Sequence, residues 1–207
     1  CGSGGARAPW ADSASNGYTA SQTASQYGPE CVGSLSALND HPAVRFGESS
    51  MTMLTLGADP IYATGTGLTV FAVVANVGDD SDDPFLFDEG WYGDEGFGLT
   101  LSGTEVWMYT PTDHGGERTS STIAIEDNAG HVISMRITFG SDQTIWVDGG
   151  QACTEAVDTS ALSSTEITWA STANDGNGPF TIGAQAKLHN QASRYVSLDL
   201  AEVLVYD

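Results

Sequence analysis

The carboxylates with the best spacing for chemistry lie around a tryptophan–tyrosine pair near the middle of the chain. They flank Trp91 and Tyr92, and they are Asp88, Glu89, Asp94 and Glu95. Two carboxyl groups held about 5–10 Å apart can hydrolyse a glycosidic bond. These carboxylates, however, fall in a glycine-rich turn rather than at alternate positions of one strand. The sequence also has no G-x-S-x-G, H-E-x-x-H or phosphate-loop motif. We therefore expect no catalytic site.

A run of aspartates gives the densest set of oxygen ligands. The loop after Gly78 contains Asp79, Asp80, Asp82 and Asp83, and carboxylate oxygens at this density suit Ca²⁺. Residues 174–178 (NDGNG) form a second candidate loop. A solvated acidic turn is the alternative interpretation, because the whole chain is acidic. We expect the histidines to take surface or turn positions rather than act as ligands; they are His41, His114, His131 and His189.

Aromatic residues beside polar ones suggest a sugar-binding surface, because a sugar stacks on a ring while its hydroxyls form hydrogen bonds. The candidates are Trp91, Tyr92, Asp94, Trp107 and Tyr109. Trp107 and Tyr109 share one strand face, because they alternate with Met108. Core packing is the favoured interpretation of that pair, and Trp91, in a glycine-flanked turn, is the better exposed candidate. Trp146 and Trp169 are expected in the core.

The charge balance excludes several kinds of partner. The 207 residues include 27 acidic and six basic side chains, for a formal charge of −21. Nucleic acids and anionic membranes are excluded, because both require clustered Lys and Arg. Cations, neutral glycans and basic protein surfaces remain. No apolar run is long enough for a membrane-spanning helix.

Short strands separated by turn signals run through most of the chain, which predicts an all-β, two-sheet antiparallel sandwich (jelly roll) forming one domain over residues 1–207. Residues 1–30 are expected to be mostly extended loop, and residues 158–166 to hold at most one helical turn. Residues 68–77 are almost continuously apolar, which suits a strand covered on both faces. Residues 97–101 and 105–109 predict one hairpin, and Asp148-Gly149 predicts another.

Several short motifs, in order, resemble the laminin G-like domains of the concanavalin A-like jelly-roll superfamily. The similar segments are residues 10–17 (WADSASNG), 38–46 (LNDHPAVRF), 69–74 (TVFAVV), 147–149 (VDG), 181–183 (TIG) and 201–207 (AEVLVYD). The resemblance implies the jelly-roll fold and a broad range of roles. These include glycan binding, adhesion and viral coats or fibres. Glycoside hydrolases of this fold carry E-x-D-x-E or E-x-D-x-x-E on one strand, and this sequence has no E-x-D.

One departure from the family concerns its first strand. A strand of the type L-V-L-W-L-x-A normally precedes the Trp10 motif and pairs near the last strand, and residues 1–9 contain nothing like it. The closing strand is then expected to have an unpaired edge, which invites pairing with another chain. The departure favours self-assembly or strand pairing.

The three cysteines are Cys1, Cys31 and Cys153. The start CGSGG resembles the N-terminus of a mature bacterial lipoprotein, in which the first cysteine carries a lipid anchor. On that interpretation Cys31 and Cys153 pair in an oxidising compartment. The alternative is that Cys1 pairs with Cys31.

The sequence thus predicts a non-enzymatic extracellular binding or adhesion module at a cell surface. Its expected ligand is a glycan or a surface protein, and Ca²⁺ is its only expected cofactor. The alternative is a structural assembly protein, such as a coat, fibre or virion decoration component.

Overall fold

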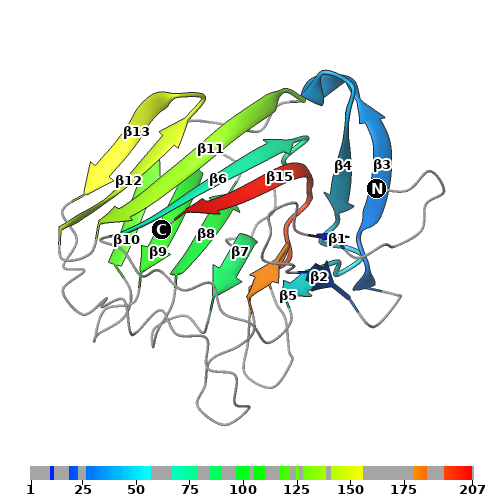
Figure 1. The fold of residues 1–207 in the computed structure, drawn as a ribbon, viewed down its shortest axis with the longest axis horizontal. Coiled ribbons are helices and arrows are strands. Elements are labelled where there is room, and N and C mark those ends of the chain that lie inside the picture. The colour runs from blue at the N-terminus through cyan, green and yellow to red at the C-terminus, as the bar shows by residue number, and fades with distance from the viewer. Residues whose placement is uncertain are drawn as a thin grey trace, which may run out of the picture.

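The structure is a computed structural model that describes most of the sandwich. The described residues are 10–11, 19–22, 27–56, 67–78, 84–89, 97–102, 105–110, 117–121, 125, 128–138, 141–155, 180–185 and 194–206. They form two antiparallel sheets and contain no α-helix, which confirms the predicted fold class (Figure 1). A short 3-10 turn, η2 (Ser36–Leu38), joins two strands.

The sheets have eight and seven strands, and every pairing is antiparallel. The eight-stranded sheet runs in the order β1 (Trp10–Ala11), β2 (Thr19–Ser21), β5 (Leu54–Leu56), β14 (Thr181–Ile182), β7 (Phe85–Glu89), β8 (Phe97–Ser102), β9 (Glu105–Thr110) and β10 (Glu117–Ser121). The seven-stranded sheet runs in the order β13 (Gly150–Glu155), β12 (Asp142–Val147), β11 (Gly130–Thr138), β6 (Gly67–Ala75), β15 (Leu198–Tyr206), β4 (His41–Phe46) and β3 (Glu30–Leu35).

The N-terminal segment, predicted to be mostly extended loop over residues 1–30, contributes two short strands. β1 and β2 pair with each other, and β2 pairs with β5, at one edge of the eight-stranded sheet. Most of residues 1–30 lie outside the described residues. The helical turn predicted over 158–166 lies outside the described residues.

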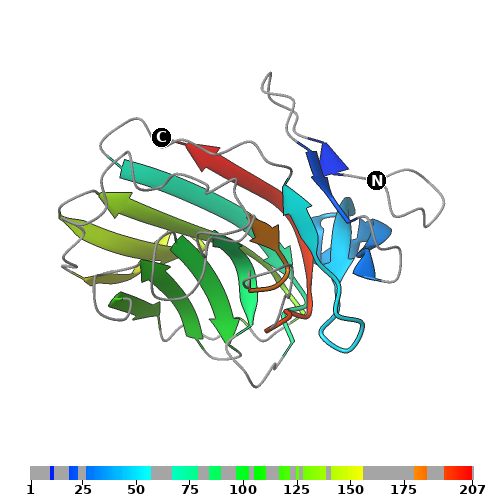
Figure 2. The same ribbon diagram turned by 90° about the horizontal axis from the view of Figure 1, so that it is seen from below.

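The core lies between the two layers, which Figure 2 shows from below. On β6, Leu68, Val70 and Val74 are buried, while the alternate residues Phe71 and Val73 are half-buried. The expectation that this strand is covered on both faces holds only at its C-terminal end. There Ala75 is fully buried, and Val73 packs against a second apolar cluster that contains Ala43. Over the rest of the strand one face covers the core and the other lies near the surface.

Both predicted hairpins are confirmed. β8 pairs with β9, and β12 pairs with β13 through a turn at Asp148 and Gly149, whose φ angles are 51° and 76°. Two positive φ angles match the tight hairpin turn that an Asp-Gly pair favours. The Asp148 carboxylate also accepts the Val132 N–H at 2.9 Å and lies 2.8 Å from Nδ1 of His131. His131 is buried, contrary to its predicted surface position.

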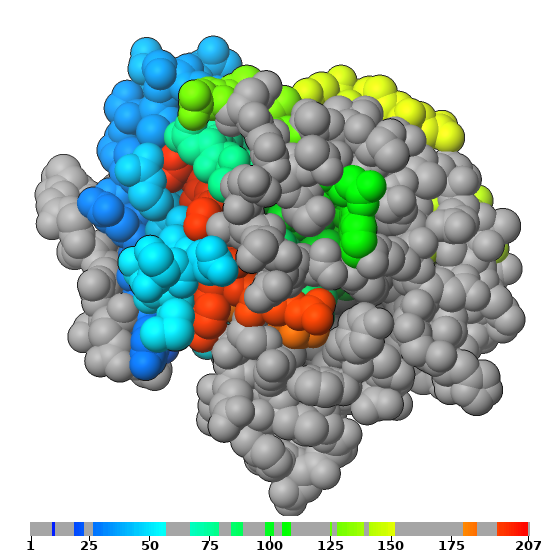
Figure 3. Space-filling view, turned by 180° about the vertical axis from the view of Figure 1, so that it is seen from behind, coloured from blue at the N-terminus to red at the C-terminus, as the bar shows by residue number. Residues whose placement is uncertain are grey.

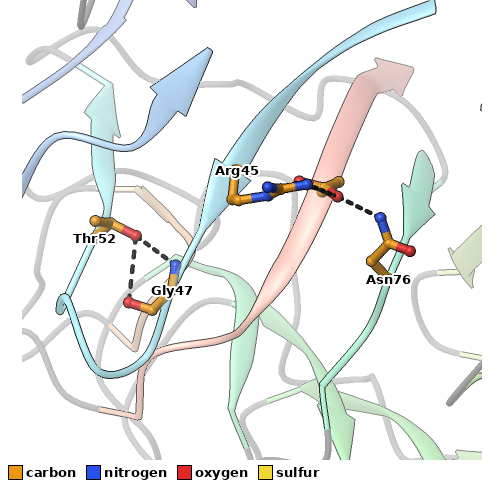
Figure 4. Close-up of polar contacts among 5 residues, drawn as sticks. Arg45, Gly47, Thr52 and Asn76 are labelled. Carbon is orange, nitrogen blue, oxygen red and sulfur yellow. Dashed lines mark hydrogen bonds and ion pairs between the residues drawn. The ribbon is translucent and has the colours of Figure 1, made fainter. Parts of the chain in front are cut away.

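A buried carboxylate joins three strands of the seven-stranded sheet (Figure 4). Asp199 on β15 is 1% exposed and accepts two hydrogen bonds from Arg45 on β4, at 2.7 and 2.9 Å. Asn76, just after β6, donates a third at 2.6 Å. The hydrogen bond with Asp199 raises the pKa of Arg45, so the guanidinium stays charged. We call Arg45, Asn76 and Asp199 the carboxylate clamp.

The loop after β4 lies against the segment that leads into β15. Gly47 donates its N–H to Oγ1 of Thr52 at 2.7 Å, which closes the loop, and Glu48 donates its N–H to Oγ of Ser197 at 3.1 Å. Figure 3 shows this contact between the light-blue loop and the red C-terminal segment. The loop and the clamp together fix β4 to the start of β15.

The carboxylate clamp predicts that loss of Arg45 lowers the stability of the fold far more than loss of Arg136 does. Arg45→Met leaves the Asp199 carboxylate buried with only Asn76 as a partner. We expect this change to lower the free energy of unfolding by about 3 kcal/mol, the lower end of the cost of breaking a buried ion pair. Arg136→Met removes a longer, partly exposed pair with Asp142 (3.7 Å) and should cost under about 1 kcal/mol. Urea denaturation measures both, and equal losses would contradict the clamp.

Candidate ligand-binding face

The face of the eight-stranded sheet that points away from the core carries Trp107. On β9, Val106 and Met108 are fully buried, while Glu105 and Trp107 are half-buried on the opposite face. The pairing of β9 with β8 explains this orientation, because Met108 lies opposite Leu99 in the core. Core packing, the favoured interpretation of Trp107, is therefore wrong.

A hydrogen bond fixes the orientation of the Trp107 ring. Its indole N–H donates to Oε2 of Glu105, two residues earlier on the same strand face. The carboxylate thus lies beside the ring edge. A ring with an adjacent carboxylate supplies the two contacts that a sugar needs: an apolar surface and a hydrogen-bond acceptor.

Thr100 is the neighbour of Trp107 on β8, and its hydroxyl has no hydrogen-bond partner although it is fully buried. On its other side Thr100 lies opposite Phe85 of β7. The Phe85 ring lies over Gly98, where a β-carbon would come within 2.8 Å of it. A buried hydroxyl without a partner is costly, and its complete burial keeps it out of reach of a ligand on the surface. We call Glu105 and Trp107 the Trp107 face.

Other predicted site residues fall partly outside the described chain. The calcium ligands predicted from the sequence, Asp79, Asp80, Asp82 and Asp83, lie outside it, as do Trp91, Tyr92 and Asp94. Tyr109 is placed in β9, but its side chain is not among those described. Asp88 is buried on β7. Within the described ranges, no group of three or more His, Cys, Asp or Glu residues could hold a metal ion.

The outer face of the seven-stranded sheet holds aromatic residues that the sequence did not single out. Trp146, expected in the core, is half-buried on this face, and the Arg136 guanidinium lies 5.4 Å from its ring centre. Phe71 meets Tyr206 edge to face, with ring centres 6.0 Å apart. The sequence did contain a signal for the position of Trp146. Alternation along β11 places Ser134 and Arg136 on the outer face, and Trp146 pairs with Ser134 and therefore lies on the same face.

The sheet order separates two of the cysteines. Cys31 lies on β3 and Cys153 on β13, and these strands form opposite edges of the seven-stranded sheet. Six strand spacings of about 4.8 Å each separate the two edges, far beyond disulfide reach. The Cys31–Cys153 pairing is therefore incompatible with this fold, and Cys31 is a half-buried free thiol.

Comparison with known proteins supports the fold and leaves the family open. No protein-family model matches the sequence, and no curated protein matches it. Solved structures do match. They include tailspike protein 2 of the Escherichia coli O157:H7 bacteriophage CAB120 (TM-score 0.57, 12% identity, 86% of this chain and 24% of that one). They also include the NanB sialidase of Streptococcus pneumoniae (TM-score 0.52, 13% identity, 73% of this chain and 25% of that one).

A third similar structure is the binding domain of botulinum neurotoxin DC, solved with rat synaptotagmin II. Its TM-score is 0.51 at 8% identity, over 96% of this chain and 41% of that one. At these identities the likeness shows the β-sandwich fold alone. The chain spans between a quarter and two fifths of the length of these proteins.

Within the described residues, no helix has the length and hydropathy needed to span a membrane.

The hydroxyl of Thr100 can be tested against a matched threonine. Thr100→Val removes a buried group without a partner, so we expect the free energy of unfolding to stay within about 1 kcal/mol or to rise. Thr181→Val removes a buried hydroxyl that donates to the Ala184 carbonyl at 2.6 Å and should cost about 1–3 kcal/mol. Urea denaturation compares the two. Equal destabilisation would show that Thr100 has a structural partner.

Proposed function

We propose that this chain is a non-enzymatic binding module that works outside the cell and binds a carbohydrate on the Trp107 face. The observation that carries the proposal is the half-buried Trp107 ring on the outer face of the sheet, oriented by Glu105. The ring offers an apolar platform, and the Glu105 carboxylate offers a hydrogen-bond acceptor beside it.

Charge favours a neutral sugar over other ligands. The chain carries a formal charge of −21, which repels polyanions such as nucleic acids and sulfated glycans. Stacking of sugar C–H groups on indole is independent of that charge. A neutral oligosaccharide therefore meets an attractive surface without an electrostatic penalty.

The comparisons are compatible with a binding or assembly role. The similar structures include a toxin binding domain, a phage tailspike and a sialidase, so the fold alone does not separate binding from catalysis. The lack of any E-x-D spacing in the sequence supports a non-enzymatic role. The motif resemblance to laminin G-like domains supports a place at a cell surface, and the tailspike likeness keeps a virion as the alternative.

A glycan array followed by titration tests the proposal. We expect the protein to bind at least one neutral oligosaccharide, and Trp107→Ala to weaken that binding at least about tenfold, equivalent to about 1.4 kcal/mol. Trp146→Ala is the matched control, because it removes a half-buried tryptophan from the outer face of the other sheet. Absence of neutral-glycan binding, or equal loss in both variants, would overturn the proposal.

Calcium support is a separate part of the proposal, and it rests on the aspartates of residues 79–83. If Ca²⁺ binds there, the melting temperature should rise with CaCl₂ and fall with EDTA, since a ligand of the folded state stabilises it. MgCl₂ at equal ionic strength controls for screening of the acidic chain.

The calcium site can be assigned with paired double variants. We expect the double variant Asp80→Asn/Asp82→Asn to lose the calcium-specific rise in melting temperature. The control double variant, Asp40→Asn/Glu202→Gln at exposed positions, should retain it. A shift of equal size with CaCl₂ and MgCl₂ would instead indicate screening.

A structural assembly role is the second candidate function, and one observation favours it specifically. Among the described strands, the closing strand β15 is paired on both sides only at Asp199 and Leu200.

A further inference from the structure

β15 lies in the interior of the seven-stranded sheet, yet on one side half of it pairs with no described strand. On one side it pairs with β6 from Asp199 to Tyr206. On the other it pairs with β4 only from Leu198 to Leu200. The register shifts after Leu200, and in Figure 1 the arrowhead of β15 points away from β4. Among the described strands, none pairs with this side of residues 202–206.

The side chains along this edge are more exposed than those of an interior strand. Val203 and Val205 pack against the main core but remain half-buried. Tyr206 is 55% exposed. Trp10 of β1 and Leu56 of β5 are the remaining apolar residues that pack against this core while only partly buried. The core is therefore incompletely covered, and an added strand would bury more of Val203 and Val205.

Residues 202–206 themselves lack the features that normally prevent strand pairing, and the bulge of this strand lies just before them, between Leu200 and Glu202. Residues 202–206 read EVLVY, with one charge and no proline, glycine or lysine. β-branched and aromatic residues favour strands, and natural edge strands usually carry lysine, proline or a bulge. An unprotected edge of this kind is a ready acceptor for main-chain hydrogen bonds.

We propose that the open edge of residues 202–206 accepts one extended strand from a partner chain. The strand would have alternating apolar residues, which would extend the apolar surface of Val203 and Val205, and neutral or basic residues at its ends. The formal charge of −21 on this protein favours a partner strand with neutral or basic ends. Two copies of the acceptor would repel each other through that charge. Residues 1–9 (CGSGGARAP) supply no large apolar side chain for the pairing.

A synthetic peptide of alternating valine and threonine, flanked by lysines, is the probe. We expect it to bind the full chain and to slow hydrogen exchange at those amides of residues 202–206 that point away from β6, because the alternate amides already bond to β6. The same peptide with N-methylated central residues keeps its side chains and charge but cannot pair as a strand. It should bind at least about tenfold more weakly, equivalent to about 1.4 kcal/mol.

Two lysine variants locate the site on the sheet. Leu204→Lys places a charge on the edge strand, and we expect at least about tenfold weaker peptide binding. Val132→Lys is the matched control, because Val132 is an exposed apolar residue of β11, which is paired on both sides. Its affinity should match that of the unaltered protein. Circular dichroism melting verifies that both variants fold.

Several outcomes would overturn this proposal. They are no detectable binding of the peptide, equal binding of the N-methylated peptide, equal loss in both lysine variants, and slow exchange, without peptide, at the amides of residues 202–206 that point away from β6. Dimers in sedimentation that protect these amides would identify a second copy as the occupant. Because the site lies on the other sheet from Trp107, Trp107→Ala should leave peptide binding unchanged, so this test and the sugar test fail independently.

Discussion

The carboxylate of Asp199 is the constraint on which the seven-stranded sheet depends. It is buried, so it must be paired, and its partners come from β4 and from the residue after β6. A charge with three fixed hydrogen bonds defines where these strands meet more tightly than apolar contacts do. The same clamp lies at the last point where β4 and β15 are paired. The clamp thus fixes β4 to β15 at Asp199, and the pairing of these two strands ends after Leu200.

Strict alternation in the central strands produces two outer faces of different character. Each strand supplies every second residue to the core, so the remaining residues must lie outside. On β9 these include Glu105 and Trp107, and on β12 and β6 they include Trp146 and Phe71. The eight-stranded sheet presents an oriented indole beside an acceptor, whereas the seven-stranded sheet presents an aromatic surface that ends at an open edge. The proposed ligand binding and the proposed strand pairing would therefore use different sheets.

Local features of the sequence predicted much of the fold, because they depend on near neighbours. The β8–β9 hairpin and the Asp148-Gly149 turn follow from alternation and turn chemistry. Alternation alone could not say which face of β9 is internal. That depends on the pairing of Met108 with Leu99, which the sequence does not encode locally. The Cys31–Cys153 pairing failed for the same reason, since the order of strands in a sheet is set by distant contacts.

The most direct test of the account is to ask which tryptophan meets the sugar. The chain has five tryptophans, each with one indole N–H signal in a ¹⁵N-labelled sample, and single substitutions assign the signals. On titration with the tightest neutral oligosaccharide from the array, the account predicts that the Trp107 signal shifts with saturation while the Trp146 signal stays in place. A saturable shift of Trp146 with Trp107 unchanged would contradict it.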